Sequence, residues 1–101
     1  MPATYQLRRY TLDPALAEDF VDFMRGCVIP ERQRLGFTVE ELLLSADRTA
    51  FTWLVSVDGD EAAFQQAEQA WAQSPQRARI FDGRPRHVLA QDIGFVRRLE
   101  P

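Results

Sequence analysis

The chain has 101 residues, a formal net charge of −3 and 46% hydrophobic residues, which fits one small folded unit and excludes an intrinsically disordered chain. Its apolar runs are too short to cross a membrane, its first residues contain no signal-peptide core, and its acidic balance argues against nucleic-acid binding. Because Cys27 is the only cysteine and cannot form a disulfide within the chain, we expect a cytoplasmic protein.

Two residue types are absent from the sequence. It contains no Lys and no Asn against 12 Arg, a bias typical of a GC-rich, bacterial genome. A Schiff-base lysine and a Walker-type phosphate loop are therefore excluded. A single His and a single Cys cannot complete a zinc site within one chain, and no GxGxxG motif is present. We therefore expect neither a resident metal nor a bound cofactor.

The N-terminal third of the chain predicts a strand followed by a long helix. Residues 4–12, TYQLRRYTL, have the Tyr, Thr and Leu content of a strand. Asp13 can cap the next helix, Pro14 fits its first position, Pro30 should kink or break it and Gly36 should end it. A spacing of three and four residues places one apolar stripe on this helix: Leu16, Phe20, Phe23, Met24, Cys27 and Val28.

The middle of the chain predicts a hairpin and a second helix. Residues 37–44 and 49–57 have the composition of strands, and the short link between them favours antiparallel pairing. Asp60 is a plausible cap for a helix that continues to about residue 73. The apolar stripe of this second helix ends at Trp71. Its earlier members are Ala63, Phe64, Ala67 and Ala70.

The last third completes a known order of elements. Residues 74–81 begin with Ser-Pro and predict a short helix, and residues 87–98 predict the last strand, with Gly94 as the site of a bulge. The resulting order, βαββαβ, is that of a ferredoxin-like α+β fold, in which two helices cover one face of a four-stranded antiparallel sheet.

The strands carry apolar residues on both of their faces. On the second strand, for example, strict alternation places Val39 and Leu43 on one face and Leu42 and Leu44 on the other. Two helices cover only one face of the sheet, so a monomer would expose a large apolar patch. We therefore expect a homodimer that pairs two sheets, with an open-faced monomer as the alternative.

An ordered set of short segments resembles the NIPSNAP-type proteins. The segments are YQLRRYTL at 5–12, VIP followed by LGF within 28–37, FTWLV at 51–55 and AWAQSP at 70–75. The resemblance covers residues 5 to about 81 and implies a single domain, 1–101, of the dimeric α+β barrel superfamily. One departure is Gln6, where the family usually has Glu, so a role of that carboxylate would not transfer to this chain.

Arg8 and Tyr10 are the first candidate site residues. They share one face of the first strand, and if Leu7 points to the helices, they face the interior of the dimer barrel. There a guanidinium and a phenol could orient an anionic or phenolic ligand. The alternative is a structural ion pair or an interface hydrogen bond, with Glu40 or Asp92 as the partner.

Trp53, Trp71 and His87 complete the set of candidate ligand-binding residues. The two tryptophans can border a space between sheet and helices, where related barrel folds, including small cofactor-free quinone-forming monooxygenases, place ligands; ordinary core packing is the alternative. His87 could serve as a general base or as half of a metal site shared across a dimer. Because it follows Arg-Pro-Arg, we expect instead an exposed, solvated histidine.

Two further features have mainly structural interpretations. Cys27 lies on the apolar stripe of the first helix and is expected to be a buried, inert thiol. A basic cluster near the C-terminus could bind phosphate, but the acidic chain favours a solvated face partly paired to acids of the first helix. The arginines of this cluster are Arg77, Arg79, Arg84, Arg86, Arg97 and Arg98.

Three hypotheses about function follow from these features. The first is a NIPSNAP-like protein that binds or transforms a small aromatic or polyketide-like molecule without a bound cofactor, as a monooxygenase would. The second is a non-catalytic homodimeric interaction module. The third is a stress-type barrel protein that binds anionic metabolites through arginine. The sequence names no catalytic residue for any of them.

Overall fold

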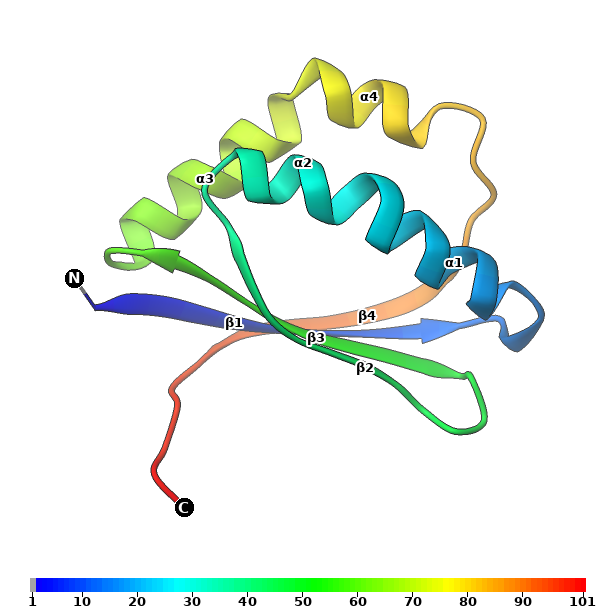
Figure 1. Cartoon of the computed structure of the whole chain (residues 1–101), viewed down its shortest axis with the longest axis horizontal. Coiled ribbons are helices and arrows are strands. Elements are labelled where there is room, and N and C mark those ends of the chain that lie inside the picture. Colours follow the sequence, from blue (N-terminus) through cyan, green and yellow to red (C-terminus); the bar gives the residue numbers. More distant parts are fainter. Residues whose placement is uncertain (1) are drawn as a thin grey trace.

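A four-stranded antiparallel sheet carries all the helices on one of its faces in the computed structural model, which describes residues 2–101 (Figure 1). The strands are β1 (Ala3–Leu12), β2 (Thr38–Leu44), β3 (Ala50–Asp58) and β4 (Val88–Val96). Their spatial order is β2-β3-β1-β4, so the first strand lies in the interior of the sheet between β3 and β4. This is the predicted ferredoxin-like α+β architecture.

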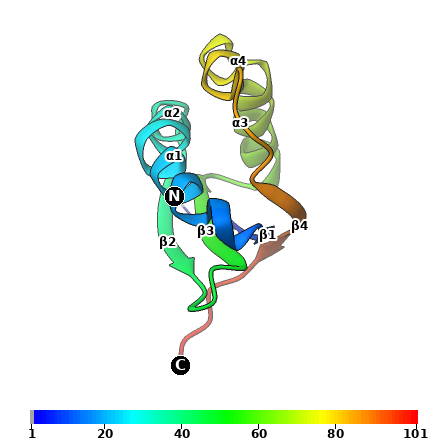
Figure 2. The same cartoon turned by 90° about the vertical axis from the view of Figure 1, so that its right-hand side faces the viewer.

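The helices form two segments above the sheet. The first segment consists of η1 (Pro14–Leu16), α1 (Ala17–Phe23), η2 (Met24–Val28) and α2 (Ile29–Arg34), and the second consists of α3 (Glu61–Gln73) and α4 (Pro75–Phe81). Figure 2 shows the first segment on the β2 side of the sheet and the second on the β4 side. None of the helices within residues 2–101 has the length and apolar character that a membrane crossing requires.

Side-chain caps fix where the helices begin, and those of Asp13 and Asp60 are the caps that the sequence predicted. The Asp13 carboxylate accepts a hydrogen bond from the backbone N–H of Ala15 at 3.0 Å. Asp60 caps α3 through the N–H of Ala63 at 2.9 Å. The Ser74 hydroxyl caps α4. At the end of α2, Gly36 adopts a φ of 100°, a left-handed conformation that a side chain would disfavour.

Pro30 does not break the first helical segment. Proline lacks an N–H group, and its ring collides with the carbonyl four residues earlier in a regular α-helix. The chain avoids this conflict with η2, a π-helical turn that widens the backbone just before Pro30 enters the first turn of α2. The helical path therefore continues to Arg34.

Two irregularities in strand pairing correct the predicted faces. The β1–β4 register shifts between Thr11 and Leu12, so the bulge lies at Leu89, whereas Gly94 pairs regularly with Leu7. The β2–β3 register also shifts, between Val39 and Glu41. The extra residue is Glu40, which lies between Val39 and Leu43 in the chain. Val39 and Leu43 therefore lie on opposite faces, because strict alternation is lost at a bulge.

The core fills the space between the sheet and the helices. Its most deeply buried large side chains are Leu12, Trp53, Val55 and Phe64. The opposite sheet face has no helix over it (Figure 2). By alternation from the buried positions, that face carries four large aliphatic residues, Leu7, Leu43, Leu54 and Val96.

Candidate functional site

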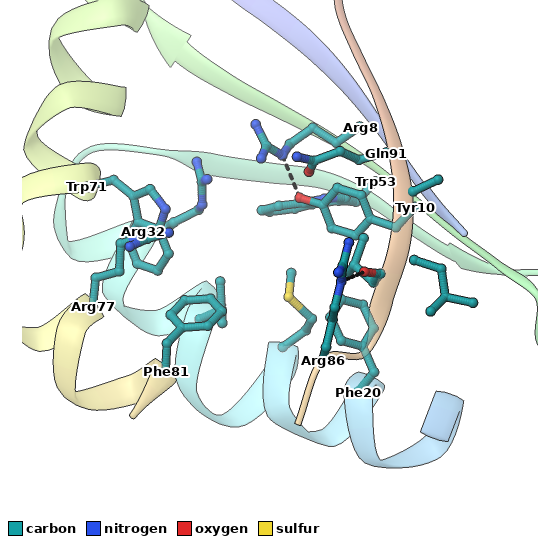
Figure 3. A pocket seen from close by; sticks show the side chains of 15 residues that line it. Arg8, Tyr10, Phe20, Arg32, Trp53, Trp71, Arg77, Phe81, Arg86 and Gln91 are labelled. Atoms are coloured by element: carbon teal, nitrogen blue, oxygen red, sulfur yellow. Dashed lines mark hydrogen bonds between the residues drawn. The ribbon is translucent and has the colours of Figure 1, made fainter. Parts of the chain in front are cut away.

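A cavity of about 390 Å³ lies between the sheet and both helical segments (Figure 3). Three exposed residues of β4 contribute to its lining, Leu89, Ala90 and Gln91. The remaining lining residues come from β1, β3, both helical segments, the loop before β4 and the first residue of β4: Arg8, Tyr10, Phe20, Met24, Val28, Arg32, Trp53, Trp71, Arg77, Phe81, Arg86 and Val88. Four of the five predicted ligand-binding candidates therefore lie around one space.

The polar face of β1 points toward the helices, which contradicts the predicted orientation. Gln6, Arg8 and Tyr10 are buried there, and Leu7 faces the open side of the sheet. Arg8 donates from Nε to the Tyr10 hydroxyl oxygen at 2.8 Å and from a terminal nitrogen to Gln6 Oε1 at 2.8 Å. These polar side chains tolerate burial because they satisfy one another, and Arg8 and Tyr10 also border the cavity.

A carboxylate on α3 links two buried arginines. Glu68 Oε1 accepts a hydrogen bond from Arg32 at 2.6 Å and lies 3.5 Å from a terminal nitrogen of Arg8. The side chain of Arg32 is only 3% exposed. The ion-pair partner of Arg8 is thus Glu68, and neither Glu40 nor Asp92 takes that role. Strand β1, helix α2 and helix α3 are joined at the cavity wall by this cluster.

A second carboxylate fixes α2 to α4. Glu31 accepts two hydrogen bonds from Arg34, at 2.7 and 2.6 Å, and one from the Ser74 hydroxyl at 2.8 Å. The Arg34 guanidinium is the main cause that lowers the pKa of Glu31 to about 2, and Ser74 adds to the effect against the opposing influence of burial. Since Ser74 also caps α4, this contact sets the position of that helix beside the cavity.

Guanidinium groups lie against both tryptophans. The Arg32 guanidinium carbon is 4.7 Å from the Trp71 ring centre and 5.3 Å from that of Trp53. Arg77 lies 5.5 Å from Trp71 and 4.9 Å from Phe81. Such contacts attract a guanidinium group to an aromatic ring and hold both cations at the cavity wall. In Figure 3, Trp71, Arg32 and Arg77 gather at one end, and Tyr10 and Phe20 lie toward the other.

His87 is buried, which contradicts the expected solvated position. It is 5% exposed, and its ring lies between Phe20 and Phe23 of α1, with centroid distances of 5.4 and 5.8 Å. Its Nε2 is 2.6 Å from Asp19 Oδ2. His87 lines a smaller neighbouring cavity of about 210 Å³ and is not among the residues that line the larger one. The contact joins the start of β4 to α1.

The two structural interpretations of the sequence need correction. Cys27 is only partly buried, at the edge of the core. Within residues 2–101, no arginine of the C-terminal basic cluster forms an ion pair with an acid of the first helix; Arg98 pairs with Glu40 of β2. Arg84 instead lies 4.2 Å from the ring centre of Phe23. The cluster divides between cavity wall and solvent because its members come from different elements.

The described part of the chain gathers no group of three or more His, Cys, Asp or Glu side chains suited to a metal ion. Its chemistry is instead that of hydrogen-bond donors and aromatic rings. Two site residues were missed from the sequence, Arg32 and Glu68, whereas Arg77 and Arg86 were named only as members of the C-terminal basic cluster. A signal existed for both missed residues. Arg32 continues the four-residue spacing of Phe20, Met24 and Val28, and Glu68 follows Phe64 by one turn.

Comparison with known proteins bears on the fold. No protein-family model matches the chain, and no curated protein matches it in sequence. Solved structures do match. A NIPSNAP family protein of Agrobacterium tumefaciens has a TM-score of 0.85 at 5% identity, over 98% of this chain and 95% of that chain. The chain has a NIPSNAP-like fold. The resemblance of the short sequence segments is thereby confirmed at the level of the fold.

Two other solved structures extend this comparison. A NIPSNAP-like domain protein of Burkholderia xenovorans has a TM-score of 0.80 at 13% identity, over 96% of this chain and 85% of that chain. A monooxygenase of Streptomyces coelicolor, in complex with the ligand nanaomycin D, has a TM-score of 0.71 at 17% identity, over 98% of this chain and 89% of that chain. The NIPSNAP-like fold thus also resembles that of a ligand-binding monooxygenase.

Proposed function

We propose that this NIPSNAP-like protein binds a small, flat aromatic molecule in the cavity between sheet and helices. The observation that carries the proposal is the wall of that cavity, which includes five aromatic residues, Tyr10, Phe20, Trp53, Trp71 and Phe81. Its volume of about 390 Å³ is within the range typical of small-molecule sites. The monooxygenase with this fold that contains nanaomycin D supports a ligand of this kind.

Native mass spectrometry of the gently purified protein tests the binding. We expect a mass adduct that disappears on denaturation and whose released molecule absorbs in the aromatic ultraviolet range. Where no molecule co-purifies, titration with a series of bicyclic and tricyclic aromatic compounds replaces this readout. Trp71→Ala removes one wall of the cavity and should weaken binding, whereas Ala72→Ser changes the exposed side of α3 and should not. A protein that binds no member of the series contradicts the proposal.

Oxygenation of the bound ring without a cofactor is the reaction we propose for this site. The monooxygenase fold neighbour supports it. Anthrone is a suitable probe: with one O2 it gives anthraquinone and one water, since one oxygen atom forms the new carbonyl and the other leaves with both methylene hydrogens. We expect quinone formation and oxygen uptake above the rate with an unrelated protein. Tight binding of anthrone without faster quinone formation would contradict the proposed oxygenase reaction and would indicate a binding protein.

We also propose that two copies pair through the sheet face opposite the helices. That face carries Leu7, Leu43, Leu54 and Val96, and soluble monomers seldom expose such apolar patches. Light scattering at micromolar concentration should give twice the chain mass. Leu54→Arg should give the monomer, and Ala72→Arg, which adds the same charge on the helical side, should not. If the wild-type protein is a monomer, the proposed dimer is wrong. If it is a dimer that binds none of the aromatic compounds, the hypothesis of a non-catalytic interaction module is favoured.

A further inference from the structure

We infer that the molecule bound in this cavity is an aromatic anion, whose carboxylate or ionised phenol oxygen is held at the Trp71 end by Arg32 and Arg77. This inference rests on the proposed function and names the chemical class of its ligand. Four features of the cavity support it: unpartnered donors, an excess of positive charge, the repulsion between two arginines that share one carboxylate, and the separation of polar from apolar walls.

The cavity wall contains buried hydrogen-bond donors without acceptors. They are the Nε atoms of Arg32 and Arg77 and the indole Nε1 of Trp53, for which residues 2–101 supply no partner. All three belong to residues that line the cavity. Arg32 is 2% exposed and Trp53 is 1% exposed, so water reaches neither side chain freely. Buried donors are normally satisfied, and these groups can only donate. They therefore require an oxygen acceptor, which reaches these nitrogen atoms only when their side chains shift, because the atoms expose almost no surface.

The cavity has more positive than negative charge. Four arginines line it, Arg8, Arg32, Arg77 and Arg86. Within residues 2–101, the ion pairs of these arginines go to a single carboxylate, Glu68. Arg77 and Arg86 have no acidic partner in that range. A ligand with a negative charge would therefore enter a site already prepared for it, and a cationic ligand would be repelled.

Arg8 and Arg32 share the Glu68 carboxylate as their ion-pair partner, and their two positive charges repel each other. Burial lowers the pKa of Arg32, the Glu68 carboxylate offsets part of this effect, and the positive charge of Arg8 lowers the pKa further. One carboxylate thus serves two guanidinium groups, at 2.6 and 3.5 Å. A second negative oxygen at this place would relieve the repulsion between Arg8 and Arg32.

The distribution of side chains gives the bound anion an orientation. Arg32 and Arg77 both lie against the Trp71 ring, with guanidinium carbons 4.7 and 5.5 Å from its centre. The wall at the other end is formed by Tyr10 and Phe20 (Figure 3). The charged oxygen therefore lies at the Trp71 end and the ring extends toward Tyr10. A phenolic or carboxylic substituent on the edge of a bicyclic ring fits this arrangement.

Calorimetric titration with a matched pair of probes tests the inference. 2-Naphthoate and 2-naphthylmethanol share one ring system and differ in charge. We expect the naphthoate to bind at least about tenfold tighter, the factor that corresponds to one charge-assisted hydrogen bond at the low end of its range. Equal affinity, or tighter binding of the alcohol, overturns the anionic class and leaves the proposed aromatic site intact. If neither probe nor any neutral ring compound binds, the proposed function itself fails.

Three variants locate the anion within the cavity. Arg77→Gln should weaken naphthoate binding about tenfold and leave naphthylmethanol unchanged. Arg79→Gln removes the same charge from the exposed side of α4 and serves as its control. Glu68→Gln should strengthen naphthoate binding, because it removes the internal competitor for Arg8 and Arg32, a gain that a merely structural role would not produce. Equal effects of the two arginine variants, or weaker binding to a folded Glu68→Gln protein, overturn the inference.

Discussion

Trp71 connects the packing of the helices to the cavity, so its removal tests the account of both. The side chain is 5% exposed. Its ring contacts the Arg32 and Arg77 guanidinium groups and makes an edge-on contact with Phe81 at 6.2 Å between centroids. Trp71→Ala would leave α3 without its largest anchor and would leave Arg32 with one aromatic neighbour fewer.

The magnitude follows from this environment. A buried tryptophan truncated to alanine costs about 3–5 kcal/mol. Because one edge of Trp71 borders the cavity and so lacks packed neighbours, we expect about 3 kcal/mol, which corresponds to roughly 12–24 °C in Tm for a domain of this size. Urea unfolding followed by circular dichroism at one fixed protein concentration measures the loss, with Trp71→Phe as a milder control. A loss under about 0.5 kcal/mol would refute the assigned anchor role.

Two other side chains give distinct predictions. Tyr10→Phe removes the hydroxyl that accepts the Arg8 Nε hydrogen bond at 2.8 Å, and urea unfolding should show a loss of about 1–3 kcal/mol; an unchanged free energy would mean that the hydrogen bond contributes nothing. Glu31 has its pKa held at about 2, against 4.5 ordinarily, so its ionised form stabilises the fold above about pH 4.5, a contribution lost as the pH falls through about 2. The Tm difference between wild type and Glu31→Gln should therefore shrink from pH 6 to pH 2, with Glu100→Gln as the exposed control; a constant difference contradicts the Glu31–Arg34 interaction.

The order and type of the elements were predictable because they depend on local signals. Asp13 and Asp60 each stand directly before a helix and cap it as predicted, and the Ser-Pro pair at 74–75 begins the predicted short helix. Gly36 ends the first helical segment in the conformation expected of it. The bulges were not predictable in position, since an inserted residue at Leu89 or Glu40 changes the pairing without any strong change in local composition.

The predicted orientation of β1 was wrong, and the reason lies in the residues that the strand buries. The alternation argument assumes that apolar residues face the core, and it therefore directed Leu7 to the helices. The actual buried face contains Gln6, Arg8 and Tyr10, because it borders a cavity and shares the Glu68 carboxylate. A strand that buries polar residues breaks the usual rule, and such exceptions concentrate at functional sites.

The candidate site was only partly visible in the sequence because its charged members come from segments far apart. Arg32 and Glu68 are separated by 36 positions and meet only after α2 and α3 pack on the sheet. His87 could not be placed from its neighbours, since the preceding Arg-Pro-Arg run indicated exposure, whereas Asp19 and two phenylalanines of α1 bury it. Helical spacing places Arg32 and Glu68 on the faces of their helices that turn inward, but it does not show which distant residue each one meets.

The indole resonances of the two tryptophans provide the most direct test of ligand binding in the cavity. Trp53 and Trp71 are the only tryptophans in the chain, and both line the cavity. In a 1H–15N correlation spectrum, titration with 2-naphthoate should move both indole signals, because both rings border the space that the ligand enters. Saturating binding, established by calorimetry, that leaves both indole signals in place would contradict the account, because the ligand would then lie outside this cavity.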